Sequence, residues 1–344
     1  MSGDATPTGA APPGTDAATG ASTAGAPATE APATDASRPV FTRPLLLREG
    51  RRPLHIEPVD GTVLRPVASR PPLREYLRLL WERRHFIVAD ARAKVATSNS
   101  GTLLGRAWLV LSPLLDAAVY LVIFGLLLRS SRGIDNFIGY LVIGVFLFQF
   151  TSRCLTQGAR SVIAGKQLVK SFAFPRAALP VASVAREALS FVPTFITLVV
   201  VVLLTRPGAE DTWTAPVEQI TWRWLLVPLV LVLQLVLNLG LALLAARATT
   251  RIPDLANVVR LFTRFWLYGS AVFFSFDRFI EHPTLLRVVE LNPMFLVLDI
   301  VRDCLLYAQT PAWDSWAVLA TWSVGLLLVG TVVFWRGEES YGSV

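Results

Sequence analysis

GARSVIAGKQLVKSFAFPRAALP, residues 158–180, is a short basic interval between two long apolar runs. It holds Arg160, Lys166, Lys170 and Arg176 and no acidic residue. Loops rich in Lys and Arg stay on the cytoplasmic side of a membrane, so this interval is predicted to be cytoplasmic and to fix the orientation of the other segments. A short basic loop with aromatic residues before a proline suits docking of a cytoplasmic partner, and we interpret it as a coupling element. The residues predicted to make this contact are Lys166, Gln167, Leu168, Lys170, Phe172, Phe174, Pro175 and Arg176.

The composition indicates a polytopic α-helical membrane protein. Hydrophobic residues make up 53% of the 344 residues, and the mean hydropathy is +0.51. Several apolar runs approach the roughly 20 residues that cross a hydrocarbon core of about 30 Å. The net charge of +7 does not indicate nucleic-acid binding, because Lys and Arg gather beside the apolar runs, where they signal topology and attract anionic lipid. The two cysteines, Cys154 and Cys304, lie far apart and support neither a disulfide framework nor a metal site.

The residue pattern divides the chain into consecutive regions. Residues 1–72 are rich in Ala, Pro and Thr and then turn basic, which predicts a disordered cytoplasmic tail and linker without a signal peptide. Residues 73–106 are predicted to be an amphipathic interfacial helix and its lead-in, residues 107–335 a transmembrane domain, and residues 336–344 a cytoplasmic C-terminus.

LREYLRLLWERRHFIVADARAK, residues 73–94, has apolar residues at helical spacing with arginines beside them. Such a helix is expected to lie in the membrane interface with its apolar face toward the lipid. The alternative is a soluble amphipathic helix that packs on a partner. The position of the segment just before the first span favours the membrane surface.

Six spans are predicted, and the loops between them set the orientation. Basic segments at 73–106, 158–176 and 247–264 alternate with short or mixed ones at 129–136 and 206–223, so both termini are expected inside the cell. The spans are predicted at 107–128, 137–157, 177–205, 224–246, 261–279 and 315–335.

The interval 277–314 is long for an outer loop and is not uniformly polar. After Asn292 and Pro293 the sequence has a helical period but is too short to span, which predicts a re-entrant or surface helix at the outer mouth. A folded outer loop without a gating role is the alternative. The polar residues expected on one face of this helix are Asp299, Arg302 and Asp303.

Ionisable residues inside spans are costly and therefore mark functional candidates. The candidates are Asp116 in the first span and Arg186 with Glu187 in the third. All three lie at a depth of roughly 13 Å from the cytoplasmic side, at about 1.5 Å per residue. We therefore predict an ion pair between Asp116 and Arg186. The alternative is that these residues line a transport path.

Two further sets of residues each have two possible roles. Gln234 and Asn238, one helical turn apart, are predicted to make hydrogen bonds between helices, and a pore-lining role is the second reading. The aromatic residues of the first three spans are predicted to serve in packing or lipid contact, with a subset that stacks on sugar rings along a channel. The candidates for that subset are Tyr120, Phe124, Phe146, Phe150 and Phe191.

The sequence contains no recognisable catalytic motif. No G-x-x-x-x-G-K-[ST] is present, and the nearest approach, Gly165-Lys166-Gln167 after Gly158, has the wrong spacing. His55, His85 and His282 are scattered and form no catalytic constellation. If ATP drives the protein, another chain must supply the ATPase.

Three motifs in order resemble permease subunits of type-2 ABC exporters of polysaccharides and teichoic acids. The first is Leu104, Gly105, Trp108 and Pro113 after a basic helix, and the second is KQLVKSFAFPRAALPVASV. The third is LNPMFLVLDIVRDCLLY, with matches at Asn292, Pro293, Arg302 and Asp303. The resemblance covers roughly residues 73–341, and the long N-terminal tail departs from the family pattern.

The resemblance implies a half-transporter in the bacterial cytoplasmic membrane. A permease homodimer would form the path, and two copies of a separate ATPase would bind ATP and Mg²⁺ and push on the coupling loop. The substrate would be a lipid-linked glycan of the O-antigen, galactan or teichoic-acid type on undecaprenyl diphosphate. Residues implied at the lipid headgroup are Arg83, Arg84, Arg92 and Lys94, and those at an outer gate are Asn292, Pro293, Asp299, Arg302 and Asp303.

Two other classes of protein are alternatives to a permease. An integral membrane transferase acting on lipid-linked sugars would share the basic helix and the aromatic spans, but it usually needs clustered carboxylates or histidines, which this sequence lacks. An ion-coupled secondary transporter would need paired interrupted spans in two halves, and no internal repeat is visible.

Overall fold

The computed structural model describes residues 71–97, 103–127, 136–167, 175–205, 221–274 and 289–338, all within one compact unit, 62–344. Regular structure in these ranges is helical, without a strand. Five of the helices are long and apolar enough to cross a membrane. This confirms the predicted class of polytopic α-helical membrane protein. The five are Trp108–Leu127, Phe137–Ala164, Ala178–Leu204, Trp222–Arg251 and Trp313–Arg336.

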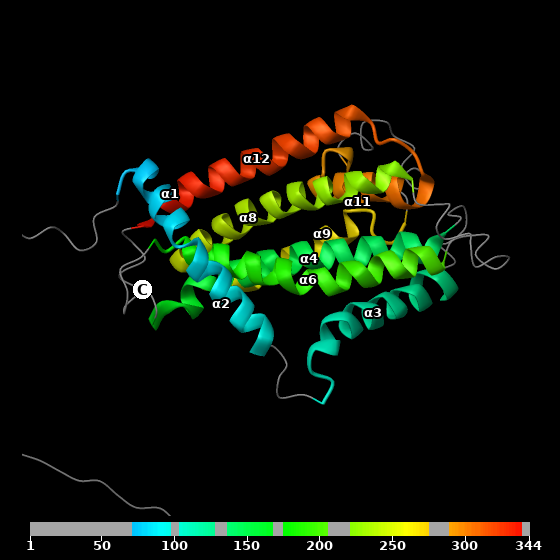
Figure 1. Cartoon of the computed structure of the whole chain (residues 1–344), viewed down its shortest axis with the longest axis horizontal. Helices are drawn as coiled ribbons and strands as arrows, with labels where there is room; N and C mark the ends of the chain where they lie inside the picture. The colour runs from blue at the N-terminus through cyan, green and yellow to red at the C-terminus, as the bar shows by residue number, and fades with distance from the viewer. Residues whose placement is uncertain are drawn as a thin grey trace, which may run out of the picture. The chain divides into compact units, whose positions relative to one another are not determined.

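The helices run along a common direction, with α1 and the C-terminal end of α12 at one end of the bundle (Figure 1). We call this the terminal end and the opposite one, where α11 lies, the distal end. In chain order the elements are α1 (Leu73–Glu82), α2 (Arg84–Thr97), η1 (Gly105–Ala107), α3 (Trp108–Tyr120), η2 (Leu121–Leu127), α4 (Phe137–Ala164), α6 (Ala178–Leu204), η3 (Trp222–Leu226), α8 (Val227–Arg251), α9 (Leu255–Tyr268), α11 (Pro293–Arg302), η5 (Asp303–Tyr307) and α12 (Trp313–Arg336).

Helix α4 is the centre of the bundle, because α3, α6, α8, α9 and α11 all pack against it. Its residues Ile143, Leu147 and Cys154 are completely buried. Helices α8 and α12 also approach closely: a Cβ added to Gly240 would lie 2.5 Å from the carbonyl carbon of Leu326. Small residues permit such contacts between membrane helices, whose association depends on close packing.

The fifth predicted span differs from the others. Predicted spans one to four and six each correspond to a helix in the structure, but 261–279 is not one continuous helix. Helix α9 begins earlier, at Leu255, and ends at Tyr268 after 14 residues, which is about 21 Å and too short to cross a bilayer. A non-helical turn follows at 269–274. The number of six crossings therefore stays a prediction.

The predicted helix at 73–94 is two helices, α1 and α2, that meet at Arg83. Tyr76 is 1% exposed and packs on Ala177 and Phe334, and Ile87 packs on Ala178 of α6. Trp81 remains 69% exposed. The apolar side therefore packs in large part on the protein's own bundle, and membrane contact remains a prediction for its exposed residues.

Candidate functional site

A cleft opens between α2, α3, α4 and α6. It consists of two cavities of about 830 and 520 Å³ that share Lys94, Gln157 and Arg186 in their walls. Arg153 also lines the first cavity, and Arg160 also lines the second. We call this the basic cleft and define it by Lys94, Arg153, Gln157, Arg160 and Arg186.

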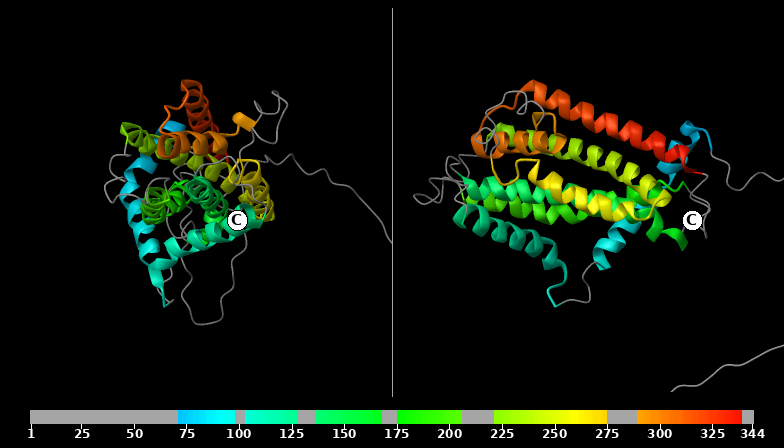
Figure 2. Two further views of the ribbon diagram at one scale, coloured as in Figure 1. Left: turned by 90° about the vertical axis from the view of Figure 1, so that its right-hand side faces the viewer. Right: turned by 180° about the vertical axis from the view of Figure 1, so that it is seen from behind.

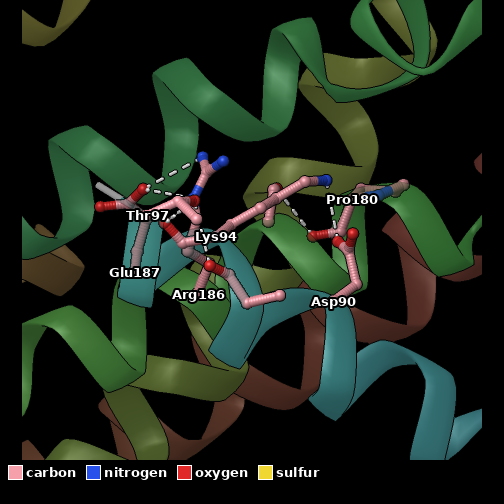
Figure 3. A network of polar contacts seen from close by, with 8 residues as sticks. Asp90, Lys94, Thr97, Pro180, Arg186 and Glu187 are labelled. Carbon is pink, nitrogen blue, oxygen red and sulfur yellow. Dashed lines mark hydrogen bonds and ion pairs between the residues drawn. The ribbon is translucent and has the colours of Figure 1, made fainter. Parts of the chain in front are cut away.

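Cations outnumber carboxylates in the basic cleft, four to two. Lys94 Nζ lies 2.8 Å from Asp90 Oδ2, and Arg186 Nη2 lies 3.2 Å from Glu187 Oε1. Figure 3 shows these two pairs, on α2 and α6, facing the same region. Neither Arg153 nor Arg160 forms an ion pair within the described residues. The cleft therefore keeps a positive charge that suits an anion.

Helix α4 carries a polar stripe along the cleft, formed by Gln149, Arg153, Gln157 and Arg160 at intervals of three and four residues. Such spacing places the four side chains on one face of the helix. Gln149 Nε2 donates to Asp116 Oδ2 at 2.7 Å, and Arg153 Nη2 donates to Gln149 Oε1 at 3.4 Å. The stripe thus links the charge on α3 to the cleft on α4.

The predicted ion pair between Asp116 and Arg186 is wrong. Asp116 accepts its hydrogen bond from Gln149, and Arg186 pairs with its sequence neighbour Glu187. Equal depth along two helices does not fix the direction in which the side chains point. Sequence reasoning also missed Arg153, although an arginine within the predicted span 137–157 meets the same criterion of an ionisable residue inside the membrane.

The basic residues assigned to the headgroup helix are not brought together. Lys94 lines the cleft. Arg92 is exposed and lines neither cavity of the cleft. Arg83 forms the break between α1 and α2, and the Arg84 guanidinium lies over the Trp81 ring at 5.2 Å. Only one residue of the predicted set therefore reaches the cleft.

Two half-helices, α9 and α11, are joined at Asn292, which precedes α11 and lies beside the C-terminal end of α9. The Asn292 Oδ1 accepts from Trp266 Nε1 at 2.9 Å and caps α11 by accepting from Met294 N at 3.0 Å. Its Nδ2 donates to the carbonyl of Gly269 at 2.8 Å and to Ser270 Oγ at 3.1 Å. The Asn-Pro motif thus ties the end of one half-helix to the start of the next. Pro293 needs no hydrogen-bond acceptor at this position, because a helix leaves its first amides unpaired.

Arg302, predicted at an outer gate, is 3% exposed and points into the protein. Its guanidinium donates to the carbonyls of Ala271 at 3.0 Å, Tyr140 at 3.2 Å and Val272 at 3.3 Å. It also lies 3.3 Å from the centre of the Tyr140 ring. Gly144 leaves room for it, because a Cβ there would lie 2.9 Å from Arg302 Nη2. Asp299 and Asp303 are half-buried.

These contacts explain why a cation lies inside the bundle. The turn at 269–274 has left the helix, and Ala271 adopts a left-handed conformation with φ of 53°. The carbonyls of this turn would lack hydrogen-bond donors in a hydrocarbon environment, where irregular backbone must be paired with protein groups. The Tyr140 hydroxyl adds bonds to Ala271 O at 2.9 Å and Phe274 O at 3.1 Å. We call Arg302, Tyr140 and the turn they hold the distal clamp.

The aromatic residues proposed for sugar contact pack on one another. Tyr120 and Phe124 lie 4.5 and 4.4 Å from Phe273 between ring centres, and Phe150 stacks on Phe191 at 4.5 Å. Phe146 is 1% exposed. In this conformation the buried rings of Phe146 and Phe150 pack inside the protein. Sugar contact remains a prediction for Tyr120, Phe124 and Phe191, which are half-buried.

The predicted interhelical role of Gln234 is confirmed. Its Nε2 donates to Leu147 O at 2.9 Å and to Thr151 Oγ1 at 3.0 Å on α4. Asn238 is completely buried on the same helix.

At the terminal end, three donor groups from Tyr76 and Arg176 bond to Glu338. Its Oε2 accepts from the Tyr76 hydroxyl at 2.8 Å, and its Oε1 accepts from Arg176 N at 3.0 Å. The Tyr76 oxygen accepts from Ala177 N at 3.1 Å, and the Arg176 guanidinium donates to the Glu338 carbonyl. We call this set the terminal latch. Burial raises the pKa of the Glu338 carboxyl above its ordinary value, while its bonds to Arg176 and Tyr76 oppose that rise.

The terminal latch touches one end of the predicted coupling loop. Helix α4 extends to Ala164, so the first part of that loop, 158–164, is helical. Lys166 and Gln167 are exposed, Pro175 is buried, and Arg176 belongs to the latch. The remaining coupling residues, Leu168, Lys170, Phe172 and Phe174, lie outside the described residues.

Comparisons with known proteins agree with this architecture. Residues 95–306 match the family model of the ABC-2 type transporter. The chain is 23% identical over 265 residues to the O-antigen export system permease protein RfbA of Myxococcus xanthus, covering 77% of this chain and 97% of the relative. It is 27% identical over 248 residues to a protein of the same name from Klebsiella pneumoniae, covering 72% and 89%. The family match takes in more than half of the chain, and the chain therefore belongs to the ABC-2 type transporter family as the membrane permease subunit of a type-2 ABC exporter.

Proposed function

We propose that this permease moves a polysaccharide on an undecaprenyl-diphosphate carrier out of the cell, and that the carrier's diphosphate enters the basic cleft. The observation that carries the proposal is the excess of cations over carboxylates in that cleft. The names of the relatives, O-antigen export permeases, support a polysaccharide as the substrate.

The chemistry of the cleft fits a diphosphate. A guanidinium offers a planar pair of donors to two phosphate oxygens, and bonds between charged groups are about twice as strong as neutral ones. Arg153 and Arg160 are the unpaired cations of the cleft within the described residues, and they lie on the same face of α4. The polar stripe continues from them to Gln149 and Asp116. A headgroup held at Arg153 would thus have a hydrophilic surface leading deeper into the bundle.

ATP hydrolysis would come from a partner. In this proposal two copies of the chain form the path, and two ATPase subunits bind ATP and Mg²⁺ below the terminal end, which faces the cytoplasm. The ATPase would push on residues 166–176. The terminal latch gives that push a route, because Arg176 bonds to Glu338 after α12 and, through Glu338, to Tyr76 on α1. Rigid helices joined in this way move as a unit.

The cleft is tested with the double variant Arg153→Gln and Arg160→Gln, purified with its ATPase and placed in vesicles. Binding of labelled undecaprenyl diphosphate is expected to weaken about tenfold or more, equivalent to roughly 1.4 kcal/mol. The matched control is Arg83→Gln with Arg84→Gln, which removes the same charge from residues outside the cleft. The control should bind the carrier like the wild type.

Equal binding by the cleft variant and the wild type would contradict the proposal. Loss of binding in the control alone would indicate that the headgroup binds at the break between α1 and α2, not in the cleft. Circular dichroism and gel filtration of both variants verify that the helices and the complex are intact.

A further inference from the structure

A second basic cavity lies on the other flank of α4, between α4 and α9. Its volume is about 330 Å³, and its walls contain three arginines, Arg160, Arg260 and Arg264. The remaining wall residues are neutral: Ser152, Thr156, Gln157, Ala256 and Thr263. The cavity therefore gathers three positive charges without a carboxylate among its lining residues.

The arginines of this cavity lack anionic partners in the described part of the chain. Arg260 Nη2 donates to the neutral Asn257 Oδ1 at 3.1 Å, and none of the three takes part in an ion pair there. Like charges gathered around one small space repel each other, more strongly where water is partly excluded. An anion in the cavity would remove this repulsion, and Ser152 and Gln157 supply neutral polar groups beside the arginines.

The position of the cavity points to a lipid. Arg160 lies one turn before the end of α4 at Ala164, and α9 starts at Leu255 near the same end of the bundle (Figure 2). Five and nine residues along α9, Arg260 and Arg264 lie roughly 8 and 14 Å from its start, at about 1.5 Å per residue. These depths span the headgroup region and the adjoining acyl chains, where long arginine side chains reach toward phosphate.

The outer surface of α9 adds the apolar part of such a site. Leu261, Phe262 and Phe265 are 54, 55 and 69% exposed beside the arginines, whereas Thr263 is the only buried residue of the helix. A helix with arginines next to exposed large apolar residues is typical of contact with an anionic membrane surface. Phosphate would occupy the cavity while acyl chains cover the apolar residues.

We propose that the cavity between α4 and α9 binds the phosphate of an anionic membrane phospholipid, which stays as a resident lipid beside the transport path. The site is separate from the basic cleft on the α2–α6 flank of α4, and only Arg160 and Gln157 contribute to both. The proposal does not depend on which substrate the permease carries.

The test uses the full permease with its ATPase in nanodiscs of phosphatidylcholine with a minor fraction of phosphatidylglycerol. The variant Arg260→Gln with Arg264→Gln is expected to retain phosphatidylglycerol about tenfold less well after exchange into lipid-free detergent, as measured by native mass spectrometry. The control Arg74→Gln with Arg78→Gln removes the same charge from α1 and should retain the lipid. The single variant Arg260→Lys keeps the charge and should bind with intermediate strength.

Three results would overturn the proposal. Equal retention of phosphatidylcholine and phosphatidylglycerol by the wild type would show that the cavity does not prefer an anionic phospholipid. Displacement of phosphatidylglycerol by equimolar undecaprenyl diphosphate would assign the cavity to the substrate carrier. Rapid disulfide formation between two chains through Phe265→Cys, with the native cysteines replaced by serine, would show that a second copy covers this surface.

Discussion

Arg153 and Arg302 are both arginines inside the bundle, yet their surroundings differ in every respect. Arg153 lines the open basic cleft of the terminal half, and its guanidinium donates a long hydrogen bond of 3.4 Å to Gln149 Oε1. Arg302 is 3% exposed and gives its guanidinium to three backbone carbonyls in the distal half. An arginine thus leaves its charge available for an anion in the terminal half, whereas in the distal half an arginine pairs with the carbonyls of a non-helical turn.

This contrast divides the molecule into a half that is built to receive polar groups and a half that is built to exclude them. Cavities with charged walls lie between the helices of the terminal half. The distal half is filled by aromatic rings that pack around Phe273 and by the buried apolar side of α11. Buried charge alone therefore does not identify a transport path; the partners of the charge do.

Replacing Arg302 with Met tests the distal half most severely. The carbonyls of Ala271 and Val272 lose charged donors in a buried place, and we expect a loss of about 3–5 kcal/mol in the free energy of unfolding. Thermal unfolding of the purified complex in detergent measures it. Arg302→Lys keeps the charge without the planar fork and should lose less. If the Met variant unfolds at the same temperature as the wild type, the distal clamp does not stabilise this half of the bundle.

Asn292→Ala removes four hydrogen bonds that join α9 to α11. Loss of a helix cap and of the bonds to Gly269 and Trp266 is expected to cost about 2–3 kcal/mol. The same unfolding assay applies, with Asn292→Asp as control, because a carboxylate keeps both acceptor bonds. An Asp variant as unstable as the Ala variant would show that donation to the turn matters more than the cap.

Arg153→Met provides the counterpart in the terminal half. Since this guanidinium has one long bond to a neutral amide, we expect less than about 1 kcal/mol of lost stability. Export of polysaccharide to the cell surface, followed by antibody labelling, should nevertheless fall. A loss of stability comparable with that of Arg302→Met would erase the distinction between the two halves.

The smallest effect is expected from pH at the terminal latch. Burial raises the pKa of Glu338 in the folded protein, so the folded state holds this proton more tightly than the unfolded state. The contribution to stability is present below the unfolded pKa and is lost as the pH rises through the raised value. Glu338→Gln should remove that part of the pH dependence, seen as a flatter plot of unfolding temperature against pH. A slope unchanged by the variant would mean that other groups titrate there.

Hydropathy alone predicted most of the helices, because a membrane span needs a long apolar run and little else. It failed at 261–279, where the run stays apolar through Ala271, Val272 and Phe273 although the helix has ended. The bonds that hold this turn come from Tyr140, Asn292 and Arg302, which are distant in sequence. No local pattern contains them.

The site was predicted less well than the fold for a related reason. Counting residues from the membrane surface gave Asp116 and Arg186 the same depth but not the direction of their side chains, and Gln149 is the partner of Asp116 instead. Of the basic residues assigned to the headgroup helix, Lys94 alone lines the cleft, although Arg84 and Arg92 lie on the same helix α2. The motif at Asn292 and Arg302 did mark an important place, as a structural joint within the distal half.

Accessibility of single cysteines tests the division of the bundle most directly. In a chain with Cys154 and Cys304 replaced by serine, Gln157→Cys would report on the charged cavities of the terminal half, and Val272→Cys would report on the distal clamp. With inside-out vesicles and a membrane-impermeant thiol reagent, we predict rapid labelling at position 157 and none at position 272. Labelling at 272 from this side, or labelling at 157 only from the opposite side of the membrane, would contradict the account.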